Sequence, residues 1–201
     1  MSEEVREFDP LKEEIMEATY RALVKHGYSD LTVQAISDEF DKSKSLLYYH
    51  YECKEDLLAD FLEYALQRFR RDVELEVEGP KAQLHELVDR LVPPELEDDS
   101  YQVQIALLEL RSEAPHNERV REQYTRVDSI LKDVIEGIVR RGIDEGVFAD
   151  LDPEAEAEIL VSLLFGVRTR RLTTDQNLPI SDTRNALETY LDRLNADEED
   201  Y

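Results

Sequence analysis

The sequence contains few of the residues on which disulfide, metal or nucleotide chemistry depends. Its single cysteine, Cys53, cannot form a disulfide within the chain. Its four histidines, His26, His50, His85 and His116, are far apart and show no metal-ligand spacing. No glycine-rich phosphate-binding loop and no nucleophile elbow is present. We therefore expect no metal, no cofactor and no enzymatic activity.

Long apolar segments are absent as well. There is no run of 18 apolar residues and no charged segment followed by an apolar leader. We therefore expect a cytoplasmic protein with no membrane partner. The length of 201 residues allows one small domain of about 50 residues and a second of about 140, which is enough for one proper core.

Basic residues are scarce. The chain has 24 Lys and Arg against 48 Asp and Glu, a formal net charge of −24 and a sequence pI of about 4.4. For the chain as a whole, this excess argues against nucleic acid as a partner. It also causes self-repulsion, which molar salt removes because the screening length falls to about 3 Å at 1 M ionic strength. The composition therefore predicts a halophilic protein.

Apolar residues recur at three- and four-residue spacings along most of the chain, and no segment is a convincing strand. Gly79-Pro80, Pro115 and Pro153 interrupt the pattern where helices end or begin. Beyond residue 53, the spacing predicts helices over residues 54–78, 81–91, 100–112, 117 to 142 or 146, 153–173 and 181–194.

Two short helical patterns meet across a polar turn between residues 27 and 57. In the first, the Thr32 hydroxyl can cap a helix whose apolar residues, such as Ile36 and Phe40, share one face. In the second, Ser43 can cap a compact helix with more aromatic rings than one core-facing stripe can bury. A helix-turn-helix unit sets its second helix into the major groove of DNA, with side chains from its N-terminal part at the base edges.

Several small motifs are spaced in a specific way between residues 11 and 61. They are Ile15 and Ala18 in a first helix, Gly27 at its end, Leu31-Thr32-Val33 and Ala35-Ile36 in a second helix, Leu47-Tyr48 in a third, and Lys54-Glu55-Asp56-Leu57 at the start of a fourth. Together they resemble the DNA-binding domain of TetR-family transcriptional regulators, over about a quarter of the chain. The resemblance implies an all-α fold. Residues 1–56 would form a three-helix helix-turn-helix DNA-binding domain, and residues 57–201 a six-helix ligand-binding and dimerisation domain.

Carried over position by position, the resemblance implies two sets of DNA contacts. The first set would touch the sugar-phosphate backbone and consists of Thr32, Ser43, Tyr48, His50 and Lys54. The second set would lie nearest the base edges and consists of Lys44, Ser45 and Tyr49. Leu46 stands where the family often has Thr, and it could meet a thymine methyl group instead. Asp41 stands where the family usually has Gly, so the turn would place an Asp in the left-handed conformation.

Some residues of this segment have a simpler interpretation. Leu47 and Tyr51 could be core residues that join the third helix to the first, which is the interpretation we favour for both. Lys44 and Lys54 could be solvated surface lysines, and His50 an ordinary surface histidine.

The residues predicted to contact DNA lie in the least acidic part of the chain. Residues 41–54 hold three lysines against two carboxylates, a net charge of +1. Each phosphate neutralised by a lysine costs affinity as the salt concentration rises. We therefore expect a DNA contact with few lysines and more hydroxyl, amide and apolar groups, adapted to high salt.

In the TetR family the helical body dimerises and holds a small-molecule pocket, so the resemblance implies a homodimer and an effector. The residues predicted for the dimer interface are Ile159, Leu163, Gly166, Arg170, Leu187, Tyr190, Leu191 and Leu194. Those that could line an apolar cavity with a few polar points are Tyr64, Gln104, Leu108, Tyr124 and Phe165. The run Arg168-Thr169-Arg170-Arg171 could meet an anionic ligand or, as we favour, the acidic surface of the partner subunit.

These features predict a sequence-specific DNA-binding transcriptional regulator. It would be a repressor that binds a palindromic double-stranded DNA operator as a homodimer and leaves it when a small-molecule effector binds. Two alternatives stay open. One is a regulator that acts as an activator, and the other is a helical protein-interaction module that binds no DNA.

Overall fold

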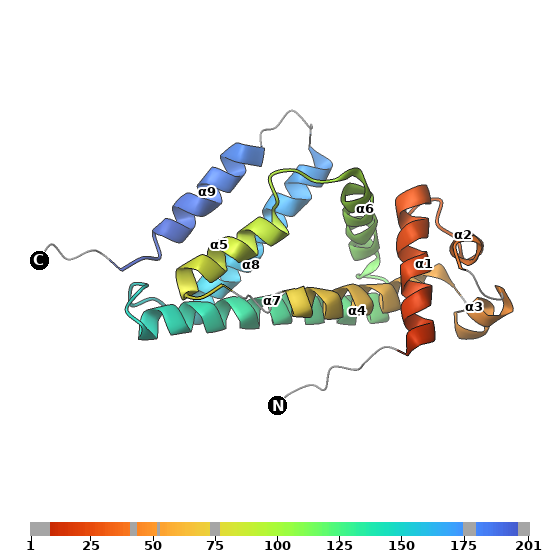
Figure 1. The fold of residues 1–201 in the computed structure, drawn as a ribbon, viewed down its shortest axis with the longest axis horizontal. Coiled ribbons are helices and arrows are strands. Elements are labelled where there is room, and N and C mark those ends of the chain that lie inside the picture. Colours follow the sequence, from red (N-terminus) through yellow and green to blue (C-terminus); the bar gives the residue numbers. More distant parts are fainter. Residues whose placement is uncertain (1–8, 41–43, 52, 73–76, 175–179, 197–201) are drawn as a thin grey trace, which may run out of the picture. The chain divides into compact units, whose positions relative to one another are not determined.

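A computed structural model describes residues 9–40, 44–51, 53–72, 77–174 and 180–196, with side chains for all of these except Lys44 and residues 68–72. This part of the chain contains nine helices, and its single β-type pairing is an isolated bridge between Phe148 and Asn195. The prediction of an all-α fold is therefore confirmed (Figure 1). The helices are α1 (Pro10–His26), α2 (Val33–Asp38), α3 (Lys44–His50), α4 (Lys54–Asp72), α5 (Pro80–Leu91), α6 (Asp98–Glu113), α7 (Glu118–Asp144), α8 (Pro153–Thr173) and α9 (Ile180–Asp192).

The helices form two compact units. Unit 1 comprises residues 1–72 and 97–126, and thus α1 to α4, α6 and the start of α7. Within it, α1 packs against α2, α4 and α6, and α2 packs against α3 (Figure 1). The largest fully buried side chains of unit 1 are Ile15, Met16, Leu23, Leu31, Ile36, Leu47, Leu57, Leu58 and Leu110. The helix-turn-helix is therefore built onto α1, with which it shares an apolar core.

Local signals set the ends of α1. The Asp9 carboxylate accepts a hydrogen bond from the backbone N–H of Leu11 at 3.1 Å, which satisfies one of the free amides of the first turn. Gly27 ends the helix at φ 68°, a conformation that costs glycine little, and its N–H donates to the Leu23 carbonyl at 2.8 Å. These two ends fix the length of the helix on which α2 and α4 pack.

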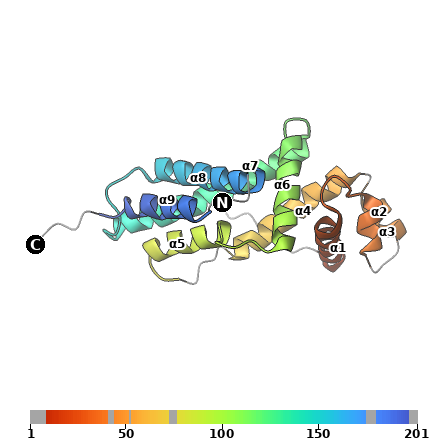
Figure 2. The same cartoon turned by 90° about the horizontal axis from the view of Figure 1, so that it is seen from above.

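Unit 2 comprises residues 73–96 and 127–201, with α5, the rest of α7, α8 and α9. Here α5 packs against α8 and α9, and α8 packs against α9 (Figure 2). At the end of α7, Gly142 lies directly beneath the Phe148 ring, and a side chain there would overlap that ring. The Gly142 carbonyl accepts hydrogen bonds from Val147 and Phe148, which returns the chain towards α8. The Asp152 carboxylate then caps the first turn of α8.

The observed helices match the predicted ones except at their ends. The helix predicted over residues 54–78 is observed as Lys54–Asp72, and residues 73–76 lie outside the described part. α6 begins at Asp98, two residues before its predicted start, and its first turn gains two carboxylates that suit the helix dipole. No helix in the described ranges is long and apolar enough to cross a membrane.

The two compact units do not divide the chain at residue 56, where the sequence predicts the domain boundary. α4 begins just beyond that boundary but packs with α1 in unit 1, as does α6. A boundary by function after residue 56 stays a prediction.

Candidate DNA-binding interface

The short helix α3 places its residues on two sharply different sides. Leu47 is fully buried and Tyr51, just after the helix, is 6% exposed. Tyr48 and Tyr49 are 51% and 83% exposed, and the Tyr49 ring meets the His50 ring edge to face at 5.2 Å. The interpretation of Leu47 and Tyr51 as core residues is confirmed. The exposed side of α3 therefore carries large aromatic side chains whose position packing in the core does not explain.

The remaining predicted contacts on α3 are also accessible. Ser45 and His50 are exposed and Leu46 is half-buried. Because residues three and four apart share a helix face, Ser45, Tyr48 and Tyr49 lie on one side. The structure therefore brings these predicted contacts together. Lys44 is the first residue of α3, whereas Asp41 and Ser43 lie outside the described residues.

Two predicted backbone contacts already have partners in the chain. The Thr32 oxygen accepts the N–H of Ala35 at 3.0 Å, so the predicted cap of α2 is confirmed. Because a hydroxyl that accepts one bond keeps its own proton to donate, the contact of Thr32 with phosphate stays a prediction. The Lys54 ammonium donates to the Tyr28 carbonyl at 3.3 Å and lies 4.5 Å from the centroid of the Tyr28 ring. Lys54 as a phosphate contact therefore stays a prediction, with its side chain held at the start of α4.

The predicted interface residues of α8 and α9 divide into two groups. Ile159 and Leu163 are 42% and 37% exposed, and Gly166 and Arg170 are exposed on the same helix. The second group is in α9 and the turn after it: Leu187, Leu191 and Leu194 are each 3% exposed, and Tyr190 is half-buried with its hydroxyl donating to the Glu156 carboxylate. The prediction that the three leucines contact a partner directly is wrong, because their side chains lie in the core of unit 2.

The arginines near the end of α8 also differ from expectation. Arg171 donates to the Pro93 carbonyl at 2.5 Å and the Pro94 carbonyl at 3.4 Å, and so binds the chain that follows α5. Arg184 on α9 donates to the Val92 carbonyl beside it. The carbonyls after the end of a helix need donors, and these guanidinium groups supply them. The prediction that Arg171 meets a partner subunit is therefore replaced by a role inside unit 2.

The predicted ligand residues belong to both units. Unit 1 holds Tyr64, Gln104 and Leu108, all half-buried, and Tyr124, which is 8% exposed. Phe165 is half-buried in unit 2. The Tyr124 hydroxyl donates to the Leu107 carbonyl, and the Arg111 guanidinium lies over its ring, 4.8 Å from the centroid. Among the described side chains, no three or more His, Cys, Asp and Glu lie close enough together to hold a metal ion.

Sequence reasoning missed three polar residues in the interior of unit 1. The side-chain oxygens of Gln67 and Gln123 are buried without a hydrogen-bond partner, and Gln123 is 7% exposed. Asp60 is also 7% exposed. All three lie among the apolar residues on one face of their helices. Asp60 follows Leu57 by three residues, and Gln123 follows Val120 by three. A polar residue among the apolar residues of a helix face was the signal that could have identified them as buried polar groups.

An exposed aromatic helix held by a buried helix-turn-helix core, at the N-terminal end of an all-helical chain, defines a helical DNA-binding regulator. Comparison with known families agrees. The model described as bacterial regulatory proteins, tetR family, matches residues 15–61, and that for the C-terminal part of BetI-type transcriptional repressors matches residues 80–196. The chain belongs to the TetR family, whose members are DNA-binding regulators rather than enzymes.

Solved structures support this assignment. A TetR transcription regulator from Haloarcula marismortui is 39% identical, with a TM-score of 0.83 over 94% of this chain and 100% of that one. A protein from Saccharomonospora viridis, assigned as a transcriptional regulator and crystallised with choline, is 25% identical, with a TM-score of 0.75 over 90% and 95% of the two chains. A protein from a Rhodococcus species, 22% identical with a TM-score of 0.75 over 92% and 98%, shares the fold. None of the curated proteins compared with the chain matches it.

Proposed function

We propose that this protein is a homodimeric repressor, acting in the cytoplasm, that binds a palindromic operator through α3 and leaves it when a small effector binds. The observation that carries the DNA contact is the 83% exposure of Tyr49 beside the exposed Tyr48, on a helix anchored by Leu47. The match of residues 80–196 to BetI-type repressors supports repression over activation. The base-edge role of Lys44, Ser45 and Tyr49 is part of this proposal.

The exposed face of α8 supports the homodimer. Ile159 and Leu163 are among the few large apolar side chains exposed in the described residues, and they lie one helical turn apart. Gly166 has open space where a side chain would be, so a second helix could approach its backbone closely. A two-fold dimer of this kind would place two α3 helices about one DNA turn apart and read a palindrome.

Leu163→Asp is expected to convert the dimer into a monomer, because it places a carboxylate at the centre of the proposed apolar contact. Light scattering should show the mass falling from twice 23.5 kDa to 23.5 kDa. Ser129→Asp adds the same charge at an exposed position of α7, away from the proposed face of α8, and should leave the dimer intact. Equal behaviour of the two variants would place the interface elsewhere.

The effector we propose is a small quaternary ammonium compound such as choline, which was bound in the Saccharomonospora viridis relative. Aromatic faces attract such cations, and unit 1 offers Tyr64 and Tyr124, the second of which already holds the Arg111 guanidinium over its ring. The buried, unpartnered oxygens of Gln67 and Gln123 would also suit a cation.

Footprinting on the DNA upstream of the gene, with and without choline, tests the function. We expect a protected palindrome with half-site centres about 10 base pairs apart or a multiple of that, and loss of protection when choline is added. Protection that choline leaves unchanged would refute the effector and keep the DNA-binding function. Absence of protected DNA would favour the helical interaction module. Transcription of the target should rise on deletion of the gene for a repressor and fall for an activator.

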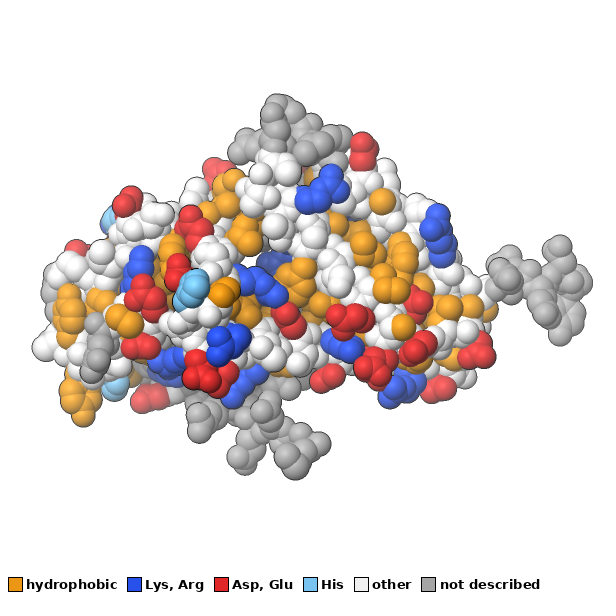
Figure 3. Space-filling model, turned by 180° about the vertical axis from the view of Figure 1, so that it is seen from behind, with side chains coloured by type: hydrophobic (Ala, Val, Ile, Leu, Met, Phe, Trp, Pro, Cys, Tyr) orange, Lys and Arg blue, Asp and Glu red, His pale blue; other side chains and the backbone are white. Residues whose placement is uncertain are grey.

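We also propose that the DNA contact works in high salt. Acidic side chains are spread over the face of the molecule in Figure 3, and the relative at 39% identity comes from a halophile. Between 0.2 and 2 M KCl, log Kd against log salt should have a slope shallower than about 3, since about 0.9 is expected for each neutralised phosphate. Circular dichroism at each salt concentration controls for folding. A slope near 9, as for about ten phosphate contacts, would contradict the proposal.

A further inference from the structure

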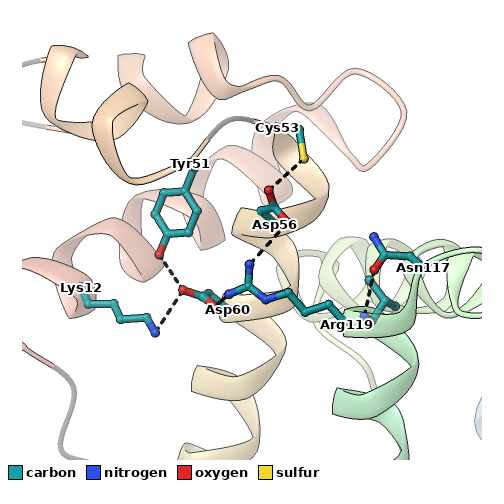
Figure 4. Close-up of polar contacts among 8 residues, drawn as sticks. Lys12, Tyr51, Cys53, Asp56, Asp60, Asn117 and Arg119 are labelled. Atoms are coloured by element: carbon teal, nitrogen blue, oxygen red, sulfur yellow. Dashed lines mark hydrogen bonds and ion pairs between the residues drawn. The ribbon is translucent and has the colours of Figure 1, made fainter.

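The carboxylate of Asp60 on α4 has partners from three other parts of unit 1 (Figure 4). Its Oδ2 accepts a hydrogen bond from the Tyr51 hydroxyl at 2.9 Å and lies 3.0 Å from the Lys12 ammonium on α1. Its Oδ1 accepts a hydrogen bond from Arg119 Nη2 on α7. The other terminal nitrogen of Arg119 lies 3.4 Å from Asp56 Oδ1, one turn earlier on α4. The four charges of this network, two carboxylates and two cations, balance.

Burial makes the network sensitive to its geometry. The Asp60 side chain is 10% exposed, whereas Lys12 and Arg119 are 32% and 45% exposed. A charge buried in this way costs desolvation free energy, which is offset only when its partners are correctly placed. In some proteins a satisfied buried network of this kind fixes the arrangement of its partners. Here the partners come from α1, from α7 and from the residue that follows α3.

Arg119 occupies an unusual place for a cation. α7 begins at Glu118, and Asn117 caps it by accepting the Val120 N–H at 3.2 Å (Figure 4). The N-terminal end of a helix carries partial positive charge and disfavours a cation. The position of Arg119 is thus stabilised by the two carboxylates of α4 rather than by its own helix, and the start of α7 is tied to α4.

Tyr51 links the end of α3 to the same carboxylate. It follows α3 directly, and its N–H donates to the Leu47 carbonyl at 3.0 Å, which continues the last turn. Burial, together with the negative charge of Asp60, raises the pKa of Tyr51 above its ordinary value, so the phenol stays protonated and can donate. A shift of the end of α3 would therefore stretch the bond to Asp60.

We infer that Asp60 is a positioning residue through which the first turn of α7 sets the placement of α3. The inference rests on the proposed function, because it assigns a route by which the body regulates the DNA contact. Arg119 lies in the segment matched to repressor C-terminal domains, and Asp60 and Tyr51 lie in the segment matched to TetR DNA-binding domains. An effector that favours a displaced α7 would reach α3 through two side-chain contacts of one carboxylate.

Arg119→Gln tests the link, with Arg121→Gln as its matched control. Arg121 lies two residues further along α7, where it donates to the Ala114 carbonyl at 3.3 Å and pairs with Glu118. Both variants lose one positive charge on the same helix. Amide hydrogen exchange, which needs no DNA, should show protection of residues 47–51 falling about tenfold in Arg119→Gln. The control should match the wild type.

Operator affinity gives the second readout. Arg119→Gln should weaken binding about tenfold and the control less than twofold, because a less fixed α3 must be ordered on binding. Arg119→Lys keeps one charge but cannot reach both carboxylates as the planar guanidinium does, so it should restore part of the loss. If Tyr51 and Arg119 act through the same carboxylate, Tyr51→Phe combined with Arg119→Gln should lose less than the product of the two single effects.

The outcomes separate this inference from the proposed function. If Arg119→Gln and Arg121→Gln agree in both hydrogen exchange and operator affinity, the inference is wrong while the DNA-binding function stands. A lower melting temperature with unchanged α3 exchange and unchanged affinity would reduce Asp60 to a stabilising residue and also overturn it. If exchange in α3 rises but the wild type binds no DNA, the link stands and the proposed function fails.

Discussion

Replacing Lys44 and Tyr49 together with alanine is expected to weaken operator binding about a thousandfold, the largest effect on DNA recognition that we predict. Tyr49 is 83% exposed and Lys44 opens the same helix. A good contact to a base edge contributes about 1–3 kcal/mol, and each change occurs twice in a dimer. Because Tyr49 lies outside the core formed around Leu47 and Lys44 is the first residue of the helix, the melting temperature should stay near that of the wild type.

The measurement is fluorescence anisotropy on the footprinted operator and on a scrambled duplex of equal length. Tyr20→Ala with Lys81→Ala provides the control, since both residues are exposed and lie on α1 and α5, outside α2 and α3. The control should bind the operator as the wild type does. If the Lys44 and Tyr49 variant also retains full affinity, α3 does not read the DNA, and the interaction module becomes the better account of the chain.

The features that could be predicted from the sequence are those determined by residues close together in the chain. Thr32 was recognisable as a cap because a capping oxygen serves amides two or three residues away. Gly27 was recognisable as a helix end because its conformation is local. The spacing of apolar residues then placed the helices, and the family resemblance assigned α3 to the DNA.

Contacts between distant residues were not predictable in this way. Arg171 lies in a basic run that suggested a partner subunit, yet its carbonyl acceptors lie 77 and 78 residues away in sequence. Leu187 and Leu191 could not be assigned to a core or an interface from helical periodicity, because both environments select the same apolar residues. The apolar stripe of α4 gave no indication that Asp60 would be matched by cations from α1 and α7.

Asp60→Asn is expected to destabilise the fold by about 2 kcal/mol, because hydrogen bonds to a charged group contribute about 1.5–3 kcal/mol. The amide keeps the shape of the carboxylate but loses its charge. It therefore leaves Lys12 and Arg119 without this carboxylate, with Asp56 still paired to Arg119, and offers one acceptor oxygen to three donors. For a chain of this length the melting temperature should fall by about 4–8 °C, as measured by circular dichroism.

The direction of this stability change distinguishes a specific role of Asp60 from a general effect of the chain's net charge. In a protein of net charge −24, removing one carboxylate relieves repulsion, and Asp133→Asn, at an exposed position of α7, should be neutral or slightly stabilising. Asp60→Asn loses the same charge with the opposite result, because its partners are arranged around it. Since salt screens exposed charges far more than buried ones, 2 M KCl should not restore its stability. Equal melting temperatures for the two variants would mean that Asp60 contributes no more than a surface carboxylate, whatever its contacts.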